Sequence, residues 1–323
     1  MPLNLDKIDK RILFELDKNS RIPETKLAQL VGRSKESVRY RIKKMQKSGV
    51  IQGFTIWIDP TKLGYQSAKI YLTLANRPEQ RRAFIEYVKK DKRLFWLGIA
   101  EGAWNAGLTF FVRSNQEFFD LKNELFSKFK DLILESRTAV LVNVNVHDKT
   151  FLYPAETSWK AMFNILVNYP LEELEKKILK ELFQNSRINV VEMTRKHHST
   201  VDIVRNRIKK LEERKIIFRY TIRIDFTKLG DEFYKTFIYF KNFTSSDEQK
   251  LMEYTRKSPQ IIHLVKQISP WDLELEIICP SYREYNMLIS ELTKEFSAIN
   301  KIETAIMSED EVFPAEKMIF EEG

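Results

Sequence analysis

Hydrophobic residues recur at two different spacings along the chain, and the change of spacing divides it into segments. Between residues 6 and 47 the apolar positions lie three or four residues apart, which predicts three helices. Pro23 stands at the start of the second helix, Gly32 at its end, and Ser34 is the expected N-cap of the third. The β-branched run from Val50 to Ile58 predicts extended chain. Three helices with a tight turn before the third, followed by a strand, predict a winged helix-turn-helix domain.

The next segment alternates between apolar and polar residues with a period of two, which is typical of strands. Strands are predicted at 68–74, 108–112 and 140–146, and helices near 79–90 and 118–129. This order predicts a βαββαβ unit, which is a ferredoxin-like α+β sandwich. The second half of the chain shows the same order, with strands at 236–240 and 273–277 and a helix near 283–296.

The whole pattern is a tandem repeat. Residues 5–64 and 171–230 are identical at 25 of 60 positions without a gap. A repeat of this length indicates a duplicated pair of domains, because solenoid repeats are only about 20–50 residues long. The fold class is therefore α+β, with two winged helix-turn-helix domains alternating with two ferredoxin-like βαββαβ domains. The expected segments are winged helix-turn-helix 1 at 1–52, a linker strand at 53–65, α+β domain 1 at 66–150, a connector at 151–169, winged helix-turn-helix 2 at 170–219, a linker strand at 220–232, and α+β domain 2 at 233–323.

The positive charge of the chain is concentrated in the two predicted winged helices. Residues 1–52 hold 13 Lys and Arg against 6 Asp and Glu, a net of +7, and residues 171–219 hold 13 against 8, a net of +5. The other 222 residues hold 28 basic and 31 acidic groups. A single cysteine, Cys279, excludes a disulfide framework within the chain. No apolar run approaches the ~18 residues of a membrane span, so a cytoplasmic protein without a membrane partner is expected.

The third helix of each copy is the expected contact with double-stranded DNA. When Val38, Ile42 and Met45 pack inward, helical periodicity turns a basic face outward. Such a face contacts phosphates, while the first turn of the helix reaches base edges. The residues predicted to bind DNA are Ser34, Lys35, Glu36, Ser37, Arg39, Tyr40, Arg41, Lys43 and Lys44 in the first copy, and Thr200, Asp202, Arg205, Asn206, Arg207, Lys209 and Lys210 in the second.

The two helices share their cations but differ in their first turns. Arg39, Arg41, Lys43 and Lys44 correspond to identical residues in the second copy, whereas Lys35-Glu36-Ser37 corresponds to Val201-Asp202-Ile203. We hypothesise that the shared cations hold phosphates and that the differing turns read bases. An asymmetric operator is then expected, in contrast to the palindrome that a symmetric dimer prefers.

The sequence resembles the Lrp/AsnC family of transcriptional regulators over nearly its whole length, twice. The motifs that carry the resemblance are Leu5-Asp6, Asn19-Ser20-Arg21, Val31-Gly32-Arg33-Ser34, Gly49-Val50-Ile51 and Asp59-Pro60 with Leu63-Gly64. The second copy departs from the family pattern, with Lys215 at the turn glycine and His197-His198 in place of Val31-Gly32. The resemblance implies a sequence-specific regulator whose α+β domains pair, here within one chain as a covalent pseudo-dimer, and assemble into homo-oligomers. It also implies that the linker strand of one copy pairs with the other copy.

The family's effector loop, a Gly-x-aromatic-Asp pattern, implies a site for a small effector such as an amino acid. In the first copy Gly102, Trp104 and Asn105 match this pattern, and in the second copy Trp271 and Asp272 do. A glycine lets backbone amides approach a carboxylate, and an aromatic side chain supplies an apolar wall. The alternative is a strand-connecting turn with a core tryptophan.

Two other classes of function remain open alongside the regulator. Siroheme decarboxylases resemble the same family, and the nearest candidate residues here are His263, Trp271 and Asp272, with Trp96 near the place of His263 in the first copy. The other alternative is an interaction scaffold that does not bind DNA. Adjacent His197 and His198 point to different sides of a helix, so no metal site is expected. The sequence therefore predicts a protein that is not an enzyme and that has no cofactor.

Overall fold

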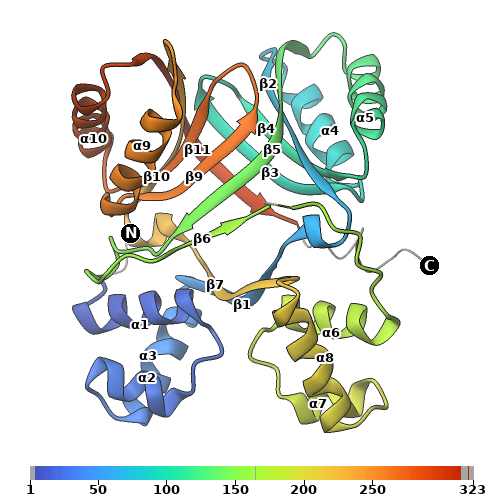
Figure 1. The fold of residues 1–323 in the computed structure, drawn as a ribbon, viewed down its shortest axis with the longest axis vertical. Coiled ribbons are helices and arrows are strands. Elements are labelled where there is room, and N and C mark those ends of the chain that lie inside the picture. The colour runs from blue at the N-terminus through green and yellow to red at the C-terminus, as the bar shows by residue number, and fades with distance from the viewer. Residues whose placement is uncertain (1–3, 164, 314–318, 320–323) are drawn as a thin grey trace.

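The computed structural model describes residues 4–163, 165–313 and 319, and its elements follow the same order twice (Figure 1). The first series is α1 (Lys7–Lys18), α2 (Glu24–Val31), α3 (Lys35–Lys47), β1 (Ile51–Ile58), η1 (Pro60–Lys62), β2 (Gln66–Leu74), α4 (Pro78–Val88), β3 (Leu94–Gly102), β4 (Ala106–Val112), α5 (Asn115–Lys128) and β5 (Ile133–His147), followed by β6 (Trp159–Met162). The second series is α6 (Glu173–Gln184), α7 (Val190–Lys196), α8 (Val201–Glu213), β7 (Ile217–Ile224), η2 (Phe226–Leu229), β8 (Glu232–Phe240), α9 (Ser245–Lys257), β9 (Ile261–Ile268), β10 (Leu273–Cys279), α10 (Tyr282–Glu295) and β11 (Ile299–Val312). The predicted α+β fold class is confirmed.

Local sequence signals set the ends of the N-terminal helices. The carboxylate of Asp6 accepts hydrogen bonds from the backbone N–H groups of Ile8 and Asp9, so α1 begins with a capping box. Gly32 ends α2 in the left-handed conformation with φ of 63°. Ser34 caps α3 by accepting from the N–H of Ser37. The predicted cap and stop residues are confirmed.

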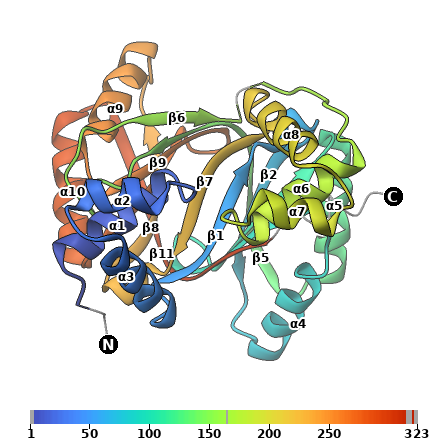
Figure 2. The same cartoon turned by 90° about the horizontal axis from the view of Figure 1, so that it is seen from below.

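The two winged units are joined by a ribbon made of one strand from each copy. β1 pairs antiparallel with β7, with Thr55 opposite Thr221. The core of the first unit contains Ile222 of β7, and the core of the second contains Ile56 of β1. Each unit is therefore completed by a strand of the other copy, which confirms the predicted pairing of linker strands. Figure 2 shows the ribbon crossing between the units, with α3 and α8 at opposite corners of that face.

A pseudo-twofold axis relates the copies and passes near a pair of equivalent serines. The hydroxyls of Ser20 and Ser186 lie 2.6 Å apart in a buried hydrogen bond. The N–H of Ser20 donates to the carbonyl of Tyr220, and the N–H of Ser186 donates to the carbonyl of Phe54. Ser20 and Ser186, and likewise Phe54 and Tyr220, are equivalent residues related by the repeat offset of 166, so the arrangement is that of a dimer within one chain.

The two α+β sheets merge at both edges. Among the described residues, eight strands close into a ring in the order β2-β4-β3-β11-β8-β10-β9-β5, with β5 returning to β2. The long strands β5 and β11 make this possible, because each leaves its own sheet and continues along the other: β5 pairs with β2 and then β9, and β11 with β8 and then β3. Helices α4, α5, α9 and α10 cover the outside of the ring (Figure 1).

The connector contains a strand that the sequence pattern did not predict. β6 adds to the end of β5, with Asn145 opposite Ala161. Its four residues are too few to show alternation, and only pairing with β5 defines them as a strand. None of the described helices is long and apolar enough to cross a membrane.

Candidate nucleic-acid interface

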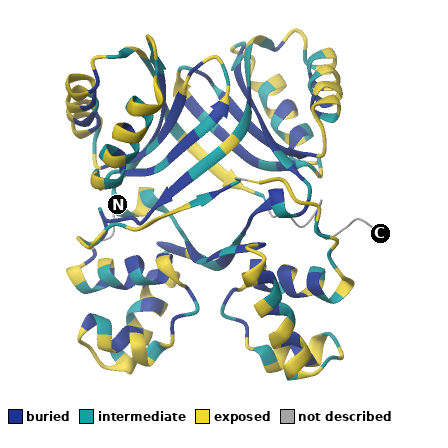
Figure 3. Ribbon diagram, in the orientation of Figure 1, coloured by how far each residue is buried: buried dark blue, intermediate teal, exposed yellow. Residues whose placement is uncertain are grey.

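Helix α3 packs one apolar stripe inward and exposes a cationic face. Val38, Ile42 and Met45 are buried, as predicted. The exposed charged residues of α3 are Lys35, Glu36, Arg39, Lys43, Lys44 and Lys47, which is five cations against one anion, a net of +4. Tyr40 is 70% exposed between them. Figure 3 shows the exposed outer surface of this unit, with the ribbon of β1 and β7 above it mostly buried or intermediate.

Two of the arginines predicted to bind DNA are held by carboxylates of their own unit. Arg41 donates to Asp6 and to Asp9, at 2.8 and 2.7 Å, and its side chain is only 23% exposed. These bonds fasten α3 to the start of α1. Arg39 donates to Glu24 at 2.7 Å, and this hydrogen bond is the main reason that the pKa of Glu24 is lowered. Arg39 remains half-exposed, whereas Arg41 is turned toward the inside of the unit.

Helix α8 has the same inward stripe but a different outer face. Val204, Ile208 and Leu211 are buried. The exposed charged residues of α8 are Asp202, Arg205, Lys209, Glu212 and Glu213, which is two cations against three anions, a net of −1. Thr200 caps the helix through the N–H of Ile203, and Asn206 is exposed.

Three of the four cations of α8 have ion-pair partners within the second unit. Arg207 contacts Glu172 and Glu175, and Lys210 lies 3.5 and 3.4 Å from the same carboxylates. Lys209 pairs with Glu213 one helical turn away at 3.6 Å. Arg207 therefore repeats the role of Arg41, and fastening the two helices gives a structural reason for the identity of these arginines in both copies. The DNA-binding roles assigned to the individual side chains stay predictions.

The two tryptophans of the predicted effector loops lie in the core between the two sheets. Trp104 and Trp271 are both less than 3% exposed and both contact the ring of Tyr71. Trp271 also stacks on Phe237 with 4.2 Å between ring centroids. These contacts are those of core side chains.

The other predicted effector residues hold turns. The side-chain oxygen of Asn105 accepts from the N–H of Leu74 at 2.9 Å, and the carboxylate of Asp272 accepts from the N–H of Phe240 at 2.7 Å. Gly102 adopts φ of 117°, and a Cβ there would lie 2.4 Å from the carbonyl oxygen of Thr304. The effector-binding role of the five residues stays a prediction, and the structure gives each of them a place in the fold.

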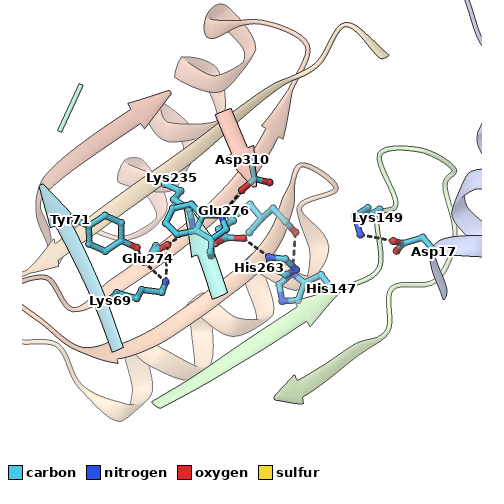
Figure 4. Close-up of polar contacts among 12 residues, drawn as sticks. Asp17, Lys69, Tyr71, His147, Lys149, Lys235, His263, Glu274, Glu276 and Asp310 are labelled. Carbon is cyan, nitrogen blue, oxygen red and sulfur yellow. Dashed lines mark hydrogen bonds and ion pairs between the residues drawn. The ribbon is translucent and has the colours of Figure 1, made fainter. Parts of the chain in front are cut away.

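A buried ionic cluster that the sequence pattern did not reveal lies inside the ring (Figure 4). Glu274 accepts hydrogen bonds from Lys69, Lys235, Tyr71 and Gln267 at 2.8 to 3.3 Å. Lys235 also pairs with Glu276, which contacts His263. Burial alone would raise the pKa of Glu274, but the ammonium groups of Lys235 and Lys69 outweigh it and lower that pKa.

The two copies contribute different residues to this cluster, although their folds are the same. Lys69 and Lys235 are equivalent in the repeat, but Glu274 and Glu276 correspond to Gly107 and Thr109. The second copy therefore supplies the carboxylates for the lysines of both copies. The only sequence signal was a polar residue at every second position of the predicted strands, which is equally typical of a solvent-exposed face.

His263, the histidine of the alternative tetrapyrrole hypothesis, lies on β9 beside the end of β5 that carries His147. Val146 lies opposite His263 in the ladder, so His147, one residue further along β5, faces the other side of the sheet: His263 contacts Glu276 inside the ring, and His147 faces α9 (Figure 4). Burial, with a contribution from His263, lowers the pKa of His147 to about 4. His147 lines a cavity of about 160 Å³ together with Trp159 and Arg256. No group of three or more metal-binding side chains occurs in the described part of the chain.

The fold and the α3 face define a DNA-binding protein of the winged helix-turn-helix class. The family described as winged helix-turn-helix DNA-binding matches residues 5–52. An uncharacterized HTH-type transcriptional regulator of Pyrococcus furiosus is 31% identical over 140 residues, which cover 43% of this chain and 93% of that protein. The HTH-type transcriptional regulator LrpA of Pyrococcus horikoshii is 32% identical over 124 residues, which cover 38% of this chain and 87% of that protein. The chain belongs to the Lrp/AsnC family of transcriptional regulators.

A structural comparison corrects one expectation. The crystal structure of the siroheme decarboxylase NirDL matches with a TM-score of 0.65 and 16% identity, and the match covers 97% of this chain and 96% of that one. This likeness shows that the two-copy fold of the whole chain also occurs in an enzyme. The prediction that a chain of this kind is not an enzyme is therefore wrong.

Proposed function

We propose that this chain is a sequence-specific transcriptional regulator that acts as a covalent pseudo-dimer and contacts DNA mainly through α3. The observation that carries the proposal is the exposed face of α3, where five cations surround one anion and an exposed tyrosine. Lys43, Lys44 and Lys47 stand on the outer side of the helix, and the exposed first turn with Lys35 and Glu36 is free to meet base edges.

Because the chain resembles Lrp/AsnC regulators, the proposal includes binding of a small effector. Because α3 and α8 differ in their exposed residues, it also includes an asymmetric operator. Because α8 exposes a net charge of −1, we expect it to contribute less to phosphate binding than α3 does. Selection of binding sites from random DNA tests the asymmetry. Two matching half-sites would contradict it.

DNA binding by the full chain is tested by titrating genomic DNA fragments at several salt concentrations. We expect salt-dependent binding, and Lys43→Ala/Lys44→Ala should weaken it roughly 10–100-fold and reduce the salt slope by about 0.9 for each lost phosphate contact. The matched control is Lys209→Ala with Arg205→Ala on α8, which should have a smaller effect. Absence of binding at low salt, or equal effects of both variants, would overturn the assignment to α3.

A second candidate function is a tetrapyrrole-modifying enzyme similar to siroheme decarboxylase. The likeness of fold along the whole chain favours it, and His147 and His263 lie on paired strands one residue out of register. The cavity lined by His147 is about 160 Å³, below the roughly 300–1,000 Å³ of most small-molecule sites. A tetrapyrrole would have to widen it.

Titration with an iron porphyrin, followed by absorbance, distinguishes the two functions. A tetrapyrrole enzyme should shift the Soret band, and His147→Ala or His263→Ala should abolish the shift while DNA binding persists. An unperturbed Soret band at equimolar and higher protein would exclude this second function.

A further inference from the structure

The first winged unit meets the second α+β domain near the N-terminal end of the described chain (Figure 1). A cavity of about 560 Å³ lies at this junction. Leu5 and Lys10 reach it from α1 and the residues before it, and Phe151 reaches it from the connector. Asp231, Ile278 and Glu284 line it from the second α+β domain. Its volume lies within the range of small-molecule sites, and its walls combine apolar surface with a few charged groups.

At the equivalent positions in the other half of the molecule, the described residues are bulkier and contact one another. There Tyr65 takes the place of Asp231 and Arg113 the place of Pro280. Tyr65 is 3% exposed, and Arg113 donates to its hydroxyl at 2.7 Å while its guanidinium lies 4.4 Å from the ring centroid. Phe111, equivalent to Ile278, stacks on Phe95 at 4.5 Å. Among the described residues, the two halves therefore differ at three lining positions, and the half with the cavity has the smaller side chains there.

The carboxylate of Glu284 also differs from its counterpart. In the first copy Glu117 accepts a hydrogen bond from the backbone N–H of Arg113 at 2.7 Å. Pro280 stands at the position of Arg113 and has no N–H to donate. Glu284 therefore lines the cavity without the backbone donor that holds Glu117.

The charged groups of the cavity wall carry a net negative charge. Asp231 and Glu284 stand against one cation, Lys10. Burial raises the pKa of Asp231, and Lys10 offsets only part of this increase while Glu284 adds to it. A positive group placed between the two carboxylates would relieve this unfavourable burial of charge.

We propose that this cavity binds a small organic amine, whose ammonium group lies between Asp231 and Glu284 and whose apolar body packs against Leu5, Phe151 and Ile278. Such a ligand bridges α1 and the second α+β domain. The proposal concerns ligand binding by the free chain, so it does not depend on the proposed DNA-binding function.

Three probes of the same shape and different charge test the proposal by isothermal titration of the full chain. Tryptamine carries an ammonium group, tryptophol is neutral, and indole-3-acetate carries a carboxylate. We expect tryptamine to bind at least about tenfold more tightly than either of the others, because only the amine forms charge-assisted hydrogen bonds with the carboxylates. Failure of tryptamine to bind at millimolar concentration, or equal binding of indole-3-acetate, would overturn the proposal.

Variants then place the ligand in this cavity. Asp231→Asn/Glu284→Gln should weaken tryptamine binding at least about tenfold, and Glu117→Gln, at the matched position of the first copy, should change it less than about twofold. Asp231→Tyr/Pro280→Arg introduces the bulkier residues of the other half and should also abolish binding. Far-UV circular dichroism confirms that each variant is folded, and Asp231→Asn alone serves if the double variant is not. Unchanged affinity in the folded cavity variants, or equal loss in Glu117→Gln, would overturn the assignment.

Discussion

The two winged units share their helices and strand exchange but differ in what they present to solvent and in how they are anchored. On the recognition helix of the first unit the exposed charges sum to +4, and on that of the second to −1. The inward apolar stripes occupy equivalent positions in both helices. Val38, Ile42 and Met45 of α3 correspond to Val204, Ile208 and Leu211 of α8. The inward stripe of the recognition helix therefore keeps its apolar character in both copies, while several exposed positions differ in charge, because packing tolerates few substitutions and a solvated face tolerates many.

The anchors beneath the units differ in kind. Asp17, at the end of α1, is 1% exposed and contacts Lys149 at 2.7 Å, Arg219 at 3.2 Å and the hydroxyl of Thr221 at 3.0 Å. In the second unit Phe183 takes the place of Asp17 and packs in an apolar core. The same junction is therefore ionic in one copy and apolar in the other, which means that single substitutions should affect the units unequally.

The largest difference is expected when the ionic anchor is broken. Asp17→Asn leaves the buried Lys149 without its carboxylate partner and leaves Arg219 with Asp148 alone at 3.3 Å, which should lower the opening free energy of the first unit by about 3 kcal/mol. Phe183→Leu in the second unit should cost less than about 1.5 kcal/mol. Hydrogen exchange with mass spectrometry reads helices α1–α3 and α6–α8 separately. Equal losses in both units would contradict the ionic nature of the first anchor.

Acid should weaken the same anchor. Burial would raise the pKa of Asp17, but Lys149 and Arg219 outweigh it and lower the pKa below its value of 3.8 in the unfolded chain. The stabilisation is therefore complete above that unfolded value and is lost as the pH falls below it through the lower folded value. Urea unfolding between pH 6 and pH 2 should show this acid-dependent loss in the wild type and a smaller one in Asp17→Asn. If the wild type and Asp17→Asn lost the same stability over this pH range, the titration of Asp17 would not be the cause of the loss.

A smaller difference is expected from the arginines that fasten the recognition helices. Arg41→Met removes the cation beside the buried carboxylate of Asp9 and should cost the first unit about 2 kcal/mol. Arg207→Met should cost less, because Glu175 keeps Lys210 at 3.4 Å and the hydroxyl of Tyr169 at 2.9 Å. Thermal unfolding of the two variants measures both losses of stability. A larger loss in Arg207→Met than in Arg41→Met would contradict this expectation.

Making the exposed face of α8 more positive should increase its contribution to DNA binding and make it more similar to α3. Asp202→Asn/Glu213→Gln changes its exposed charge from −1 to +1 and releases Lys209 from its partner. We expect roughly 3–10-fold tighter DNA binding at low salt, and a smaller gain at high salt. The control Glu173→Gln removes a carboxylate from α6 instead and should have little effect. An equal gain in the control would point to net charge alone.

The smallest effect is expected on the pseudo-twofold axis. Ser20→Ala or Ser186→Ala removes one buried hydroxyl of the pair and should cost about 1 kcal/mol in either case. Because the two serines share one hydrogen bond, the double variant should cost less than the sum of the single ones. Additive effects in urea unfolding would show that the hydroxyls act separately.

Much of the fold was predictable because its signals are local. The caps at Ser34 and Gly32 and the inward stripe of α3 depend on residues within one or two turns of each other. The closed ring was not predictable, because β5 and β11 pair with residues more than a hundred positions away. Strand β6 was missed because its four residues are too few to show alternation.

The site was predictable only in part. Periodicity identified the outer face of α3, but it could not show that Arg41 turns back to Asp6 and Asp9, since those residues lie more than 30 positions away. It also could not show that the tryptophans of the predicted effector loops lie in the core between the sheets.

The sequence by itself determined the repeat, the element order, the caps and the location of the positive charge, because each depends on composition or on neighbours along the chain. Only the tertiary structure decided what the polar faces of the strands meet. Lys69 and Glu274 alternate with apolar residues as solvent-exposed side chains do, yet they face each other inside the ring. Closure of the two sheets removes water from that face, and paired charges are then the arrangement that compensates for their burial.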